Sequence, residues 1–208
     1  MKKQLISLCC FLALATFAQA QNSGQFGLRV GVSLGHYSLT SNGMSFGFSD
    51  QLLPFGRLTY ALPSKSRTTL QLESGVGMRS LNFWLPGDIG FPSAPSITFT
   101  NLEAGLLLRH TIALPGAASI QLIGGPTASY AIAGATRMGD SRMPLDLPSS
   151  GINRLDVGFD VGAGVNFGYQ EQYGLELRYG RGFNSLVPEE DGTKLIHQQF
   201  SLGLNYRF

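Results

Sequence analysis

The stretch Ile196-His197-Gln198-Gln199-Phe200-Ser201-Leu202-Gly203-Leu204-Asn205-Tyr206-Arg207-Phe208 decides the fold. Its even positions are apolar apart from Gln198, and its odd positions are polar or glycine. Because successive side chains of an extended strand point to opposite faces, this segment has one apolar face and one polar face. The pattern predicts a β-strand that separates two different environments.

The apolar face of this strand ends in an aromatic residue at the last position. Alternating apolar residues followed by a terminal Phe resemble the C-terminal signature of bacterial outer-membrane β-barrels, in which the barrel assembly machinery reads the last strand. The resemblance implies that this assembly signal consists of Phe200, Leu202, Leu204, Tyr206 and Phe208. A half-buried strand of a soluble sheet alternates in the same way, so the rest of the chain must distinguish the two.

The first 20 residues have the three parts of a secretory signal peptide. They are a short basic start, an apolar run over residues 5–17 and a small-x-small cleavage site at residues 18–20. We therefore expect residues 1–20 to be removed on export, which makes Gln21 the first residue of the mature chain.

The composition of the mature chain is unusual for a soluble protein. The only cysteines, Cys9 and Cys10, lie in the leader, so we expect an exported protein without disulfides. Removing Lys2 and Lys3 with the leader leaves 13 basic and 13 acidic residues, and this balance does not favour a nucleic-acid partner. Only 13% of the chain is charged, against roughly 25% in ordinary soluble domains.

Seven further segments alternate in the same way as the last strand. They cover about 26–34, 51–62, 67–82, 98–113, 118–133, 154–168 and 172–183. Each can supply the about 9–11 residues that a tilted strand needs to cross a membrane, and no apolar run beyond the leader approaches the ~20 residues of a spanning helix. Only helices and closed barrels satisfy their backbone in lipid. The sequence therefore predicts an all-β fold, a closed eight-stranded antiparallel up-and-down transmembrane β-barrel over residues 21–208.

The connections between these strands alternate in length. Short ones lie near 63–66, 115–117 and 169–172, and long ones near 38–50, 83–96, 134–153 and 184–195. Short turns on one rim and long loops on the other are typical of outer-membrane barrels, in which an even strand number places both termini on the periplasmic side. We expect aromatic side chains to form a belt facing the lipid at each rim. The periplasmic belt contains Phe26, Tyr60, Phe167, Tyr173, Tyr206 and Phe208, and the outer one contains Trp84, Tyr130 and Phe183.

Four segments resemble the PorT-like family of outer-membrane β-barrel domains. They are residues 101–109, similar to its "LEIPLLLK" strand with Gly105 in place of the usual Pro; 124–130, similar to "GPYxGY"; 155–164, similar to "DFGxxxGxG"; and 179–184, similar to "YxxGLxN". The resemblance spans most of the mature chain and implies an eight-stranded outer-membrane barrel. One member assists protein secretion and gliding, and that role is not transferred to this chain.

The polar faces of the predicted strands contain six cations and five anions. An eight-stranded barrel has an interior only wide enough for side chains, and an unpaired charge there is costly. We therefore expect an ionic network that fills the lumen, with Glu103 and Arg109 reaching across to Glu73 and Arg79, and not the lining of a pore. Its members are Arg29, Arg57, Glu73, Arg79, Glu103, Arg109, Asp156, Asp160, Glu176, Arg178 and Arg207.

Two alternatives belong to other functional classes. His36-Tyr37-Ser38 resembles the His-x-Ser of a barrel lipid A deacylase, and the strand phase places His36 and Ser38 on the lipid side near the outer rim. No orienting acid can be assigned beside them from the sequence, and an interfacial His with a Ser at the start of a loop explains them equally. The second alternative is a soluble lipocalin-like barrel that binds a ligand between inward-facing apolar side chains.

The sequence predicts a protein that is not an enzyme and has no metal or cofactor, because its three histidines form no cluster with cysteine. We expect a monomer whose partners are outer-membrane lipid, the assembly machinery and, through the long loops, another protein. Apolar residues in the loops at 83–86 and 138–145 are able to contact such a partner or to fold over the barrel mouth.

Overall fold

The computed structural model describes residues 24–41, 44–47, 51–82, 95–115, 118–139, 141–168, 171–188 and 193–208. The predicted leader, residues 1–20, lies outside the described residues, as does Trp84 of the predicted outer belt. No helix in the described part of the chain is long and apolar enough to cross a membrane.

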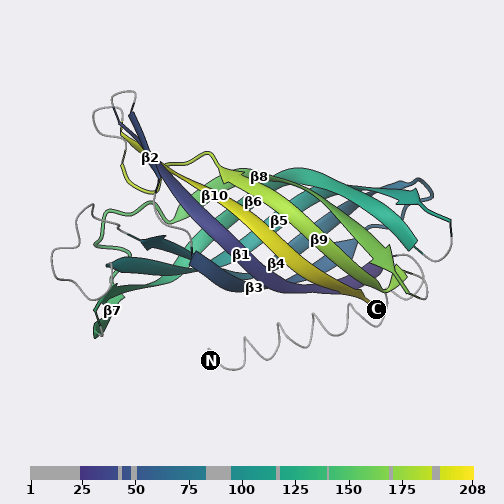
Figure 1. Cartoon of the computed structure of the whole chain (residues 1–208), viewed down its shortest axis with the longest axis horizontal. Coiled ribbons are helices and arrows are strands. Elements are labelled where there is room, and N and C mark those ends of the chain that lie inside the picture. The colour runs from purple at the N-terminus through teal and green to yellow at the C-terminus, as the bar shows by residue number, and fades with distance from the viewer. Residues whose placement is uncertain are drawn as a thin grey trace, which may run out of the picture.

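The described residues form one antiparallel sheet of ten strands (Figure 1). The strands are β1 (Gln25–Ser41), β2 (Met44–Gly47), β3 (Gln51–Ala61), β4 (Thr68–Asn82), β5 (Ser96–Ala113), β6 (Ala118–Met138), β7 (Ser141–Leu145), β8 (Leu155–Phe167), β9 (Tyr173–Gly182) and β10 (Lys194–Arg207).

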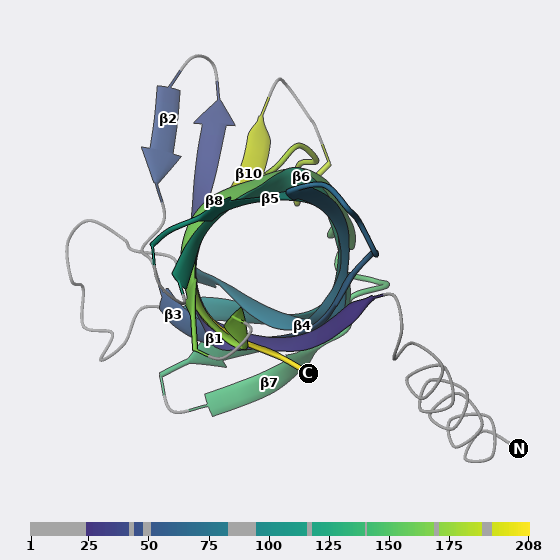
Figure 2. The ribbon, with the colours of Figure 1, turned by 90° about the vertical axis from the view of Figure 1, so that its right-hand side faces the viewer.

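Eight of these strands close into a ring. Its order is β1-β3-β4-β5-β6-β8-β9-β10, and β10 pairs back onto β1. The closing pair runs from Gly27 opposite Arg207 to Thr40 opposite Lys194, and the Phe208 amide donates a hydrogen bond to the Phe26 carbonyl at 2.9 Å. Figure 2, which looks along the barrel, shows the closed ring. The predicted all-β, antiparallel up-and-down barrel is confirmed.

The two faces of the strands are oriented as a membrane barrel requires. The side chains of Val157, Phe159 and Leu204 are 39%, 42% and 59% exposed on the outside, whereas Arg29 is fully buried and Asp160 is 4% exposed. A soluble barrel needs the opposite arrangement, because exposed apolar surface of this extent has no favourable contact with water. The lipocalin-like alternative is therefore wrong.

The structure extends two strands beyond the predicted limits. The segment 38–50 is not entirely loop, because β1 continues to Ser41 and forms a hairpin with β2. The segment 134–153 likewise contains the end of β6 and its partner β7. Both hairpins project beyond the same end of the barrel (Figure 1), which we call the loop end. The opposite rim, with the β3–β4, β5–β6 and β8–β9 connections, is the short-turn end.

Apolar side chains close the inside of the barrel at the loop end. Tyr37, Leu81 and Leu195 form one buried cluster. Phe99, Ala131 and Leu147 form another, and Leu186 packs against both. Leu147 and Leu186 follow the strands β7 and β9, so residues of the loops fold inward over the mouth.

The aromatic belt predicted at the short-turn end is present. The rings of Phe26 and Tyr60 lie 4.5 Å apart, and those of Phe167 and Tyr173 lie 6.1 Å apart. Tyr206 lies between Tyr173, at 5.5 Å, and Phe208, at 5.1 Å. These amphipathic and apolar rings therefore line the part of the rim formed by β8, β9, β10, β1 and β3, where a membrane interface favours them.

Candidate functional site

The candidate site is the polar interior of the barrel. Every strand of the ring except β6 contributes at least one of its charged side chains. Alternation with a period of two turns the polar positions of each strand inward. Side chains of the eleven predicted members are all buried or half-buried. They are Arg29 from β1, Arg57 from β3, Glu73 and Arg79 from β4, Glu103 and Arg109 from β5, Asp156 and Asp160 from β8, Glu176 and Arg178 from β9, and Arg207 from β10.

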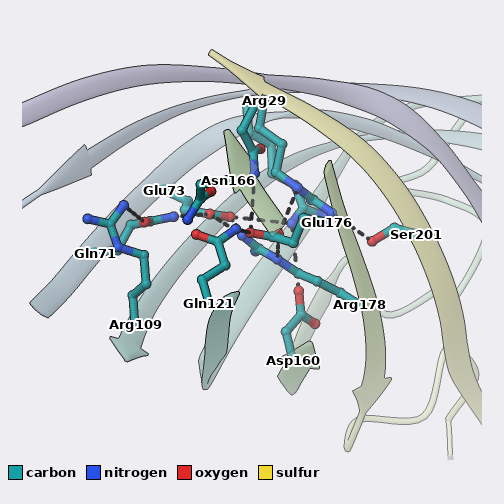
Figure 3. A network of polar contacts seen from close by, with 12 residues as sticks. Arg29, Gln71, Glu73, Arg109, Gln121, Asp160, Asn166, Glu176, Arg178 and Ser201 are labelled. Atoms are coloured by element: carbon teal, nitrogen blue, oxygen red, sulfur yellow. Dashed lines mark hydrogen bonds and ion pairs between the residues drawn. The ribbon is translucent and has the colours of Figure 1, made fainter. Parts of the chain in front are cut away.

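An ion pair that crosses the lumen lies at the centre of the network (Figure 3). Arg178 Nη1 and Nη2 lie 2.7 Å and 2.6 Å from the two carboxylate oxygens of Glu73, and Arg178 Nε also contacts Glu176. The strands β4 and β9 are four places apart in a ring of eight, so they lie on opposite sides of it. A bidentate pair of this kind is geometrically specific as well as strong.

A second set of ion pairs continues from the centre toward the loop end. Arg57 Nη2 lies 2.8 Å from Glu103, and its Nη1 lies 3.5 Å from Glu73 and 3.6 Å from Asp160. Arg79 Nη1 lies 2.7 Å from an Asp156 oxygen, and Arg79 Nη2 lies 3.7 Å from Glu103. These six residues and Arg178 thus connect five strands, β3, β4, β5, β8 and β9, through the interior.

Arg29 makes three contacts in the interior, although only one of its guanidinium nitrogens donates a hydrogen bond to a described residue. Its Nε lies 3.0 Å from Glu176, its Nη2 donates to the Ser201 hydroxyl at 3.1 Å, and its guanidinium lies 4.6 Å from the centre of the Phe55 ring. Arg57 lies 5.1 Å from the centre of that ring. The Phe55 ring therefore attracts both guanidinium groups.

Neutral side chains that the sequence analysis did not assign to the network complete it. Gln71 and Gln121 donate to Glu73 and Glu176, both at 2.7 Å, and Asn205 donates to Glu176 at 3.3 Å. Their inward phase in the strands was visible in the sequence. Their roles were not, because an amide is neutral and nothing in a sequence shows which carboxylate it meets.

The arginines nearest the short-turn end have different surroundings from those at the centre. Arg207 donates to Gln121 at 3.0 Å and to Asn166 at 2.8 Å, and lies 3.5 Å from Glu171. Arg109 donates to the Gln71 amide oxygen at 3.3 Å. The expected contact of Arg109 with an acid of the neighbouring strand is not found, since no acid of the described residues forms an ion pair with it.

Glycines provide the space that these long side chains occupy. A methyl group on Gly203 would lie 2.8 Å from Arg29 Nε, and one on Gly77 would lie 2.8 Å from the Glu103 carboxylate. A side chain at either position would therefore displace a member of the network.

Little open space remains between these groups. A cavity at the centre of the network, lined by Arg57, Glu103 and Asp156 among others, has a volume of about 20 Å³. A second cavity, beside Tyr37 and His197, has about 10 Å³. A buried water molecule needs roughly 10–15 Å³, so each cavity has room for about one.

The residues of the alternative enzymatic site lie where the sequence analysis placed them. His36 and Ser38 are on the outward face of β1 toward the loop end, opposite Gln198 and Ile196 of β10, and both are half-buried. Among the described residues, no group of three or more His, Cys, Asp or Glu side chains is arranged to hold a metal ion.

The structure is similar to solved structures of outer-membrane proteins at low sequence identity. OprG from Pseudomonas aeruginosa is 13% identical, with a TM-score of 0.48, and the match covers 89% of this chain and 96% of that one. Neisserial surface protein A is 12% identical, with a TM-score of 0.46 and coverages of 88% and 97%. Ail of Yersinia pestis is 13% identical, with a TM-score of 0.42 and coverages of 89% and 99%.

No curated protein sequence matches this chain significantly. The family model described as "Outer membrane protein beta-barrel domain" matches residues 6–208, which is nearly the whole sequence. With a closed ring of antiparallel strands, an apolar exterior and an ionic interior, the chain belongs to the outer membrane protein beta-barrel domain family, and its location is the bacterial outer membrane.

Proposed function

We propose that this protein is a small, monomeric, non-enzymatic barrel with a structural, binding or secretion-accessory role, and that its interior is a filled ionic core and not an open pore. The observation that supports this proposal best is the bidentate contact of Arg178 with Glu73 across the ring. A solute passing along the barrel axis has to separate this pair.

The neighbouring contacts strengthen the obstruction. Arg57 and Asp160 come from β3 and β8, which are also opposite one another in the ring, and their charged atoms lie 3.6 Å apart. Breaking a buried ion pair by removing one partner costs about 3–5 kcal/mol, so spontaneous opening of the interior is strongly disfavoured.

Conductance and stability measurements on the wild type and the variant Glu103→Ala test the proposal. We expect the wild-type barrel to give no discrete channels in a planar lipid bilayer. Glu103→Ala should lower the unfolding temperature, because Arg57 loses its partner at 2.8 Å, and should still open no conductance. Stable channels of reproducible size in the wild type would contradict the filled core.

The finer family placement rests on the four PorT-like segments, which lie on β5, β6, β8 and at the end of β9. We propose that the chain is a PorT-like member that is exported by residues 1–20, which are then removed. N-terminal sequencing of the protein from outer membranes should give Gln21 as the first residue.

The loop end is the most suitable place for a protein partner. Met138 and Met143, on the β6–β7 hairpin, are 52% and 51% exposed, whereas the inward cluster of Phe99 and Leu147 is buried. Crosslinking from the β6–β7 hairpin in whole cells should capture a partner. A variant with both methionines changed to serine should lose it while the barrel remains folded.

Lipid modification through His36 and Ser38 is the competing proposal. Their neighbouring, half-buried positions on the lipid side of β1 support it. Mass spectrometry of lipid A from cells with and without the protein distinguishes the two. A change in acylation that disappears in both His36→Ala and Ser38→Ala would establish the enzyme, and unchanged lipid A supports the non-enzymatic role.

A further inference from the structure

A cavity of about 610 Å³ opens at the short-turn end of the barrel. Inward-facing residues of β1, β3, β4 and β5 and the β3–β4 turn line it, and they are Gly24, Gln25, Ala61, Leu62, Pro63, Ser64, Lys65, Thr69 and Arg109. Its volume falls within the roughly 300–1,000 Å³ of small-molecule sites. Unlike the small cavities of the ionic core, it has room for a ligand.

The charge of the cavity has one sign. Of the described residues that line it, Lys65 and Arg109 are cationic and none is acidic. Lys65 is exposed at the turn, and Arg109 lies deeper, opposite Thr69 of the neighbouring strand. The pair therefore presents a positive charge at the entrance and another at the base.

Arg109 is the one interior arginine that forms no ion pair with an acid in the described part of the chain. Arg109 is only 8% exposed, and its Nε is buried without a hydrogen-bond partner among the described residues. Within the described ranges, the hydrogen bond that its side chain forms is the 3.3 Å bond to the neutral Gln71. Four other arginines, Arg29, Arg57, Arg79 and Arg178, each have a carboxylate within 3.0 Å.

We propose that this cavity binds a ligand with a free carboxylate, the size of a short peptide, which enters from the short-turn end. The guanidinium fork of Arg109 matches a carboxylate in two parallel hydrogen bonds. Lys65 attracts the anion at the entrance, and the apolar surfaces of Ala61, Leu62 and Pro63 contact the adjoining part of the ligand.

The ligand pair that tests this site differs only at the carboxylate. Acetyl-Ala-Ala has it, and acetyl-Ala-Ala-amide has a neutral group in its place. By calorimetric titration of the detergent-folded full barrel, we expect saturable one-to-one binding of the acid and about tenfold or more weaker binding of the amide, since a charge-assisted pair is lost. Equal binding of the two would overturn the proposal.

Three variants locate the site. Arg109→Gln and Lys65→Gln should each weaken binding of acetyl-Ala-Ala, Arg109→Gln by about tenfold or more. Arg67→Gln is the matched control, because it removes an exposed cation of the same turn that does not line the cavity, and it should bind as the wild type does. Unchanged affinity in Arg109→Gln, or equal losses in all three variants, would overturn the proposal.

Stability separates a binding role of Arg109 from a structural one. No acid of the described residues loses an ion pair in Arg109→Gln, so the ligand-free variant should unfold near the wild-type temperature or above it, whereas a clearly lower temperature would indicate a structural arginine. Inorganic phosphate serves as the simple anion. Weaker binding of phosphate than of acetyl-Ala-Ala supports the peptide-sized site, and binding of phosphate alone would overturn it.

Discussion

Glu73 and Arg178 form a direct bond between opposite sides of the barrel. Both are almost fully buried, and their contact joins the two terminal nitrogens of Arg178 to the two carboxylate oxygens of Glu73. A charge left without its partner in this interior has little water to compensate it. The free energy of the folded state therefore depends on the pair being complete, whichever residue is removed.

Glu73→Gln tests this dependence without changing the shape of the side chain. We expect the free energy of unfolding, measured by urea titration in lipid, to fall by about 3–5 kcal/mol. Glu171→Gln is the control. It removes a carboxylate that is 3.5 Å from Arg207 and 32% exposed, so its effect should stay within about 1 kcal/mol. Equal effects at the two sites would contradict a cooperative ionic core.

Glycine at position 75 permits two strands to approach one another. A methyl group there would lie 2.6 Å from the Arg57 Cα atom and would also meet the Gly56 carbonyl oxygen of β3. Gly75→Ala should therefore lower the unfolding temperature by displacing backbone. At Gly105 the nearest atom to an added methyl group is 3.5 Å away, so Gly105→Ala should be tolerated. The same thermal unfolding assay on both variants compares them, and the reverse order would be inconsistent with close strand approach.

For single residues, the sequence predicted the direction of the side chain but not its interaction partner. Alternation was enough to turn Arg29, Glu103 and Asp160 inward, because a strand allows only two directions for a side chain. Their partners depend on which strands face one another across the lumen. That relation requires the order and register of the closed ring, and so the Arg178–Glu73 pair was not predicted and Arg109 was given an acidic partner that it lacks.

Among the secondary-structure elements, the eight strands of the ring were predicted with limits close to those observed. β8 was expected at about 154–168 and spans Leu155–Phe167, and β3 was expected at about 51–62 and spans Gln51–Ala61. The extensions of β1 and β6 were missed, because they protrude beyond the membrane and have no reason to alternate. The extra residue of β6 between Ala131 and Ala133, opposite Thr100 and Asn101, also has no signal in the pattern.

The last strand combines a structural role with the proposed assembly signal. The side chains of Phe200, Leu202, Leu204, Tyr206 and Phe208 all point outward, and Phe208 is 73% exposed. Because so exposed a ring contributes little packing, deleting Phe208 should reduce the amount of folded barrel in cells and leave the stability of the barrel that does form nearly unchanged. Heat-dependent mobility in gel electrophoresis and thermal unfolding measure the two quantities.

Phe167→Ala is the matched control for this deletion. Phe167 belongs to the same aromatic belt, is 46% exposed and lies far from the end of the sequence. It should leave the yield of folded barrel near that of the wild type. A similar loss of yield in both proteins would show that belt aromatics in general, and not the terminal residue, determine assembly.

For the whole molecule, the asymmetry between the two ends predicts its orientation. The loop end contains the β6–β7 hairpin and the segment after it, and the short-turn end contains compact connections such as residues 62–67. A protease cleavage site inserted near Gly139 should be cut when protease is added to intact cells. The same site inserted near Lys65 should be cut only after the outer membrane is opened. The reverse result would contradict the periplasmic placement of the short turns.

The pairing of β1 with β10 brings the two ends of the barrel domain together, since the Phe208 amide bonds to the Phe26 carbonyl. A short linker can therefore join these ends, and new termini can be opened in the β6–β7 hairpin, to give a circular permutant. Such a permutant retains every neighbour of every strand while its terminal aromatic becomes an internal residue. Its folding therefore tests whether the ring requires only the right strand neighbours or also the natural order of the strands along the chain.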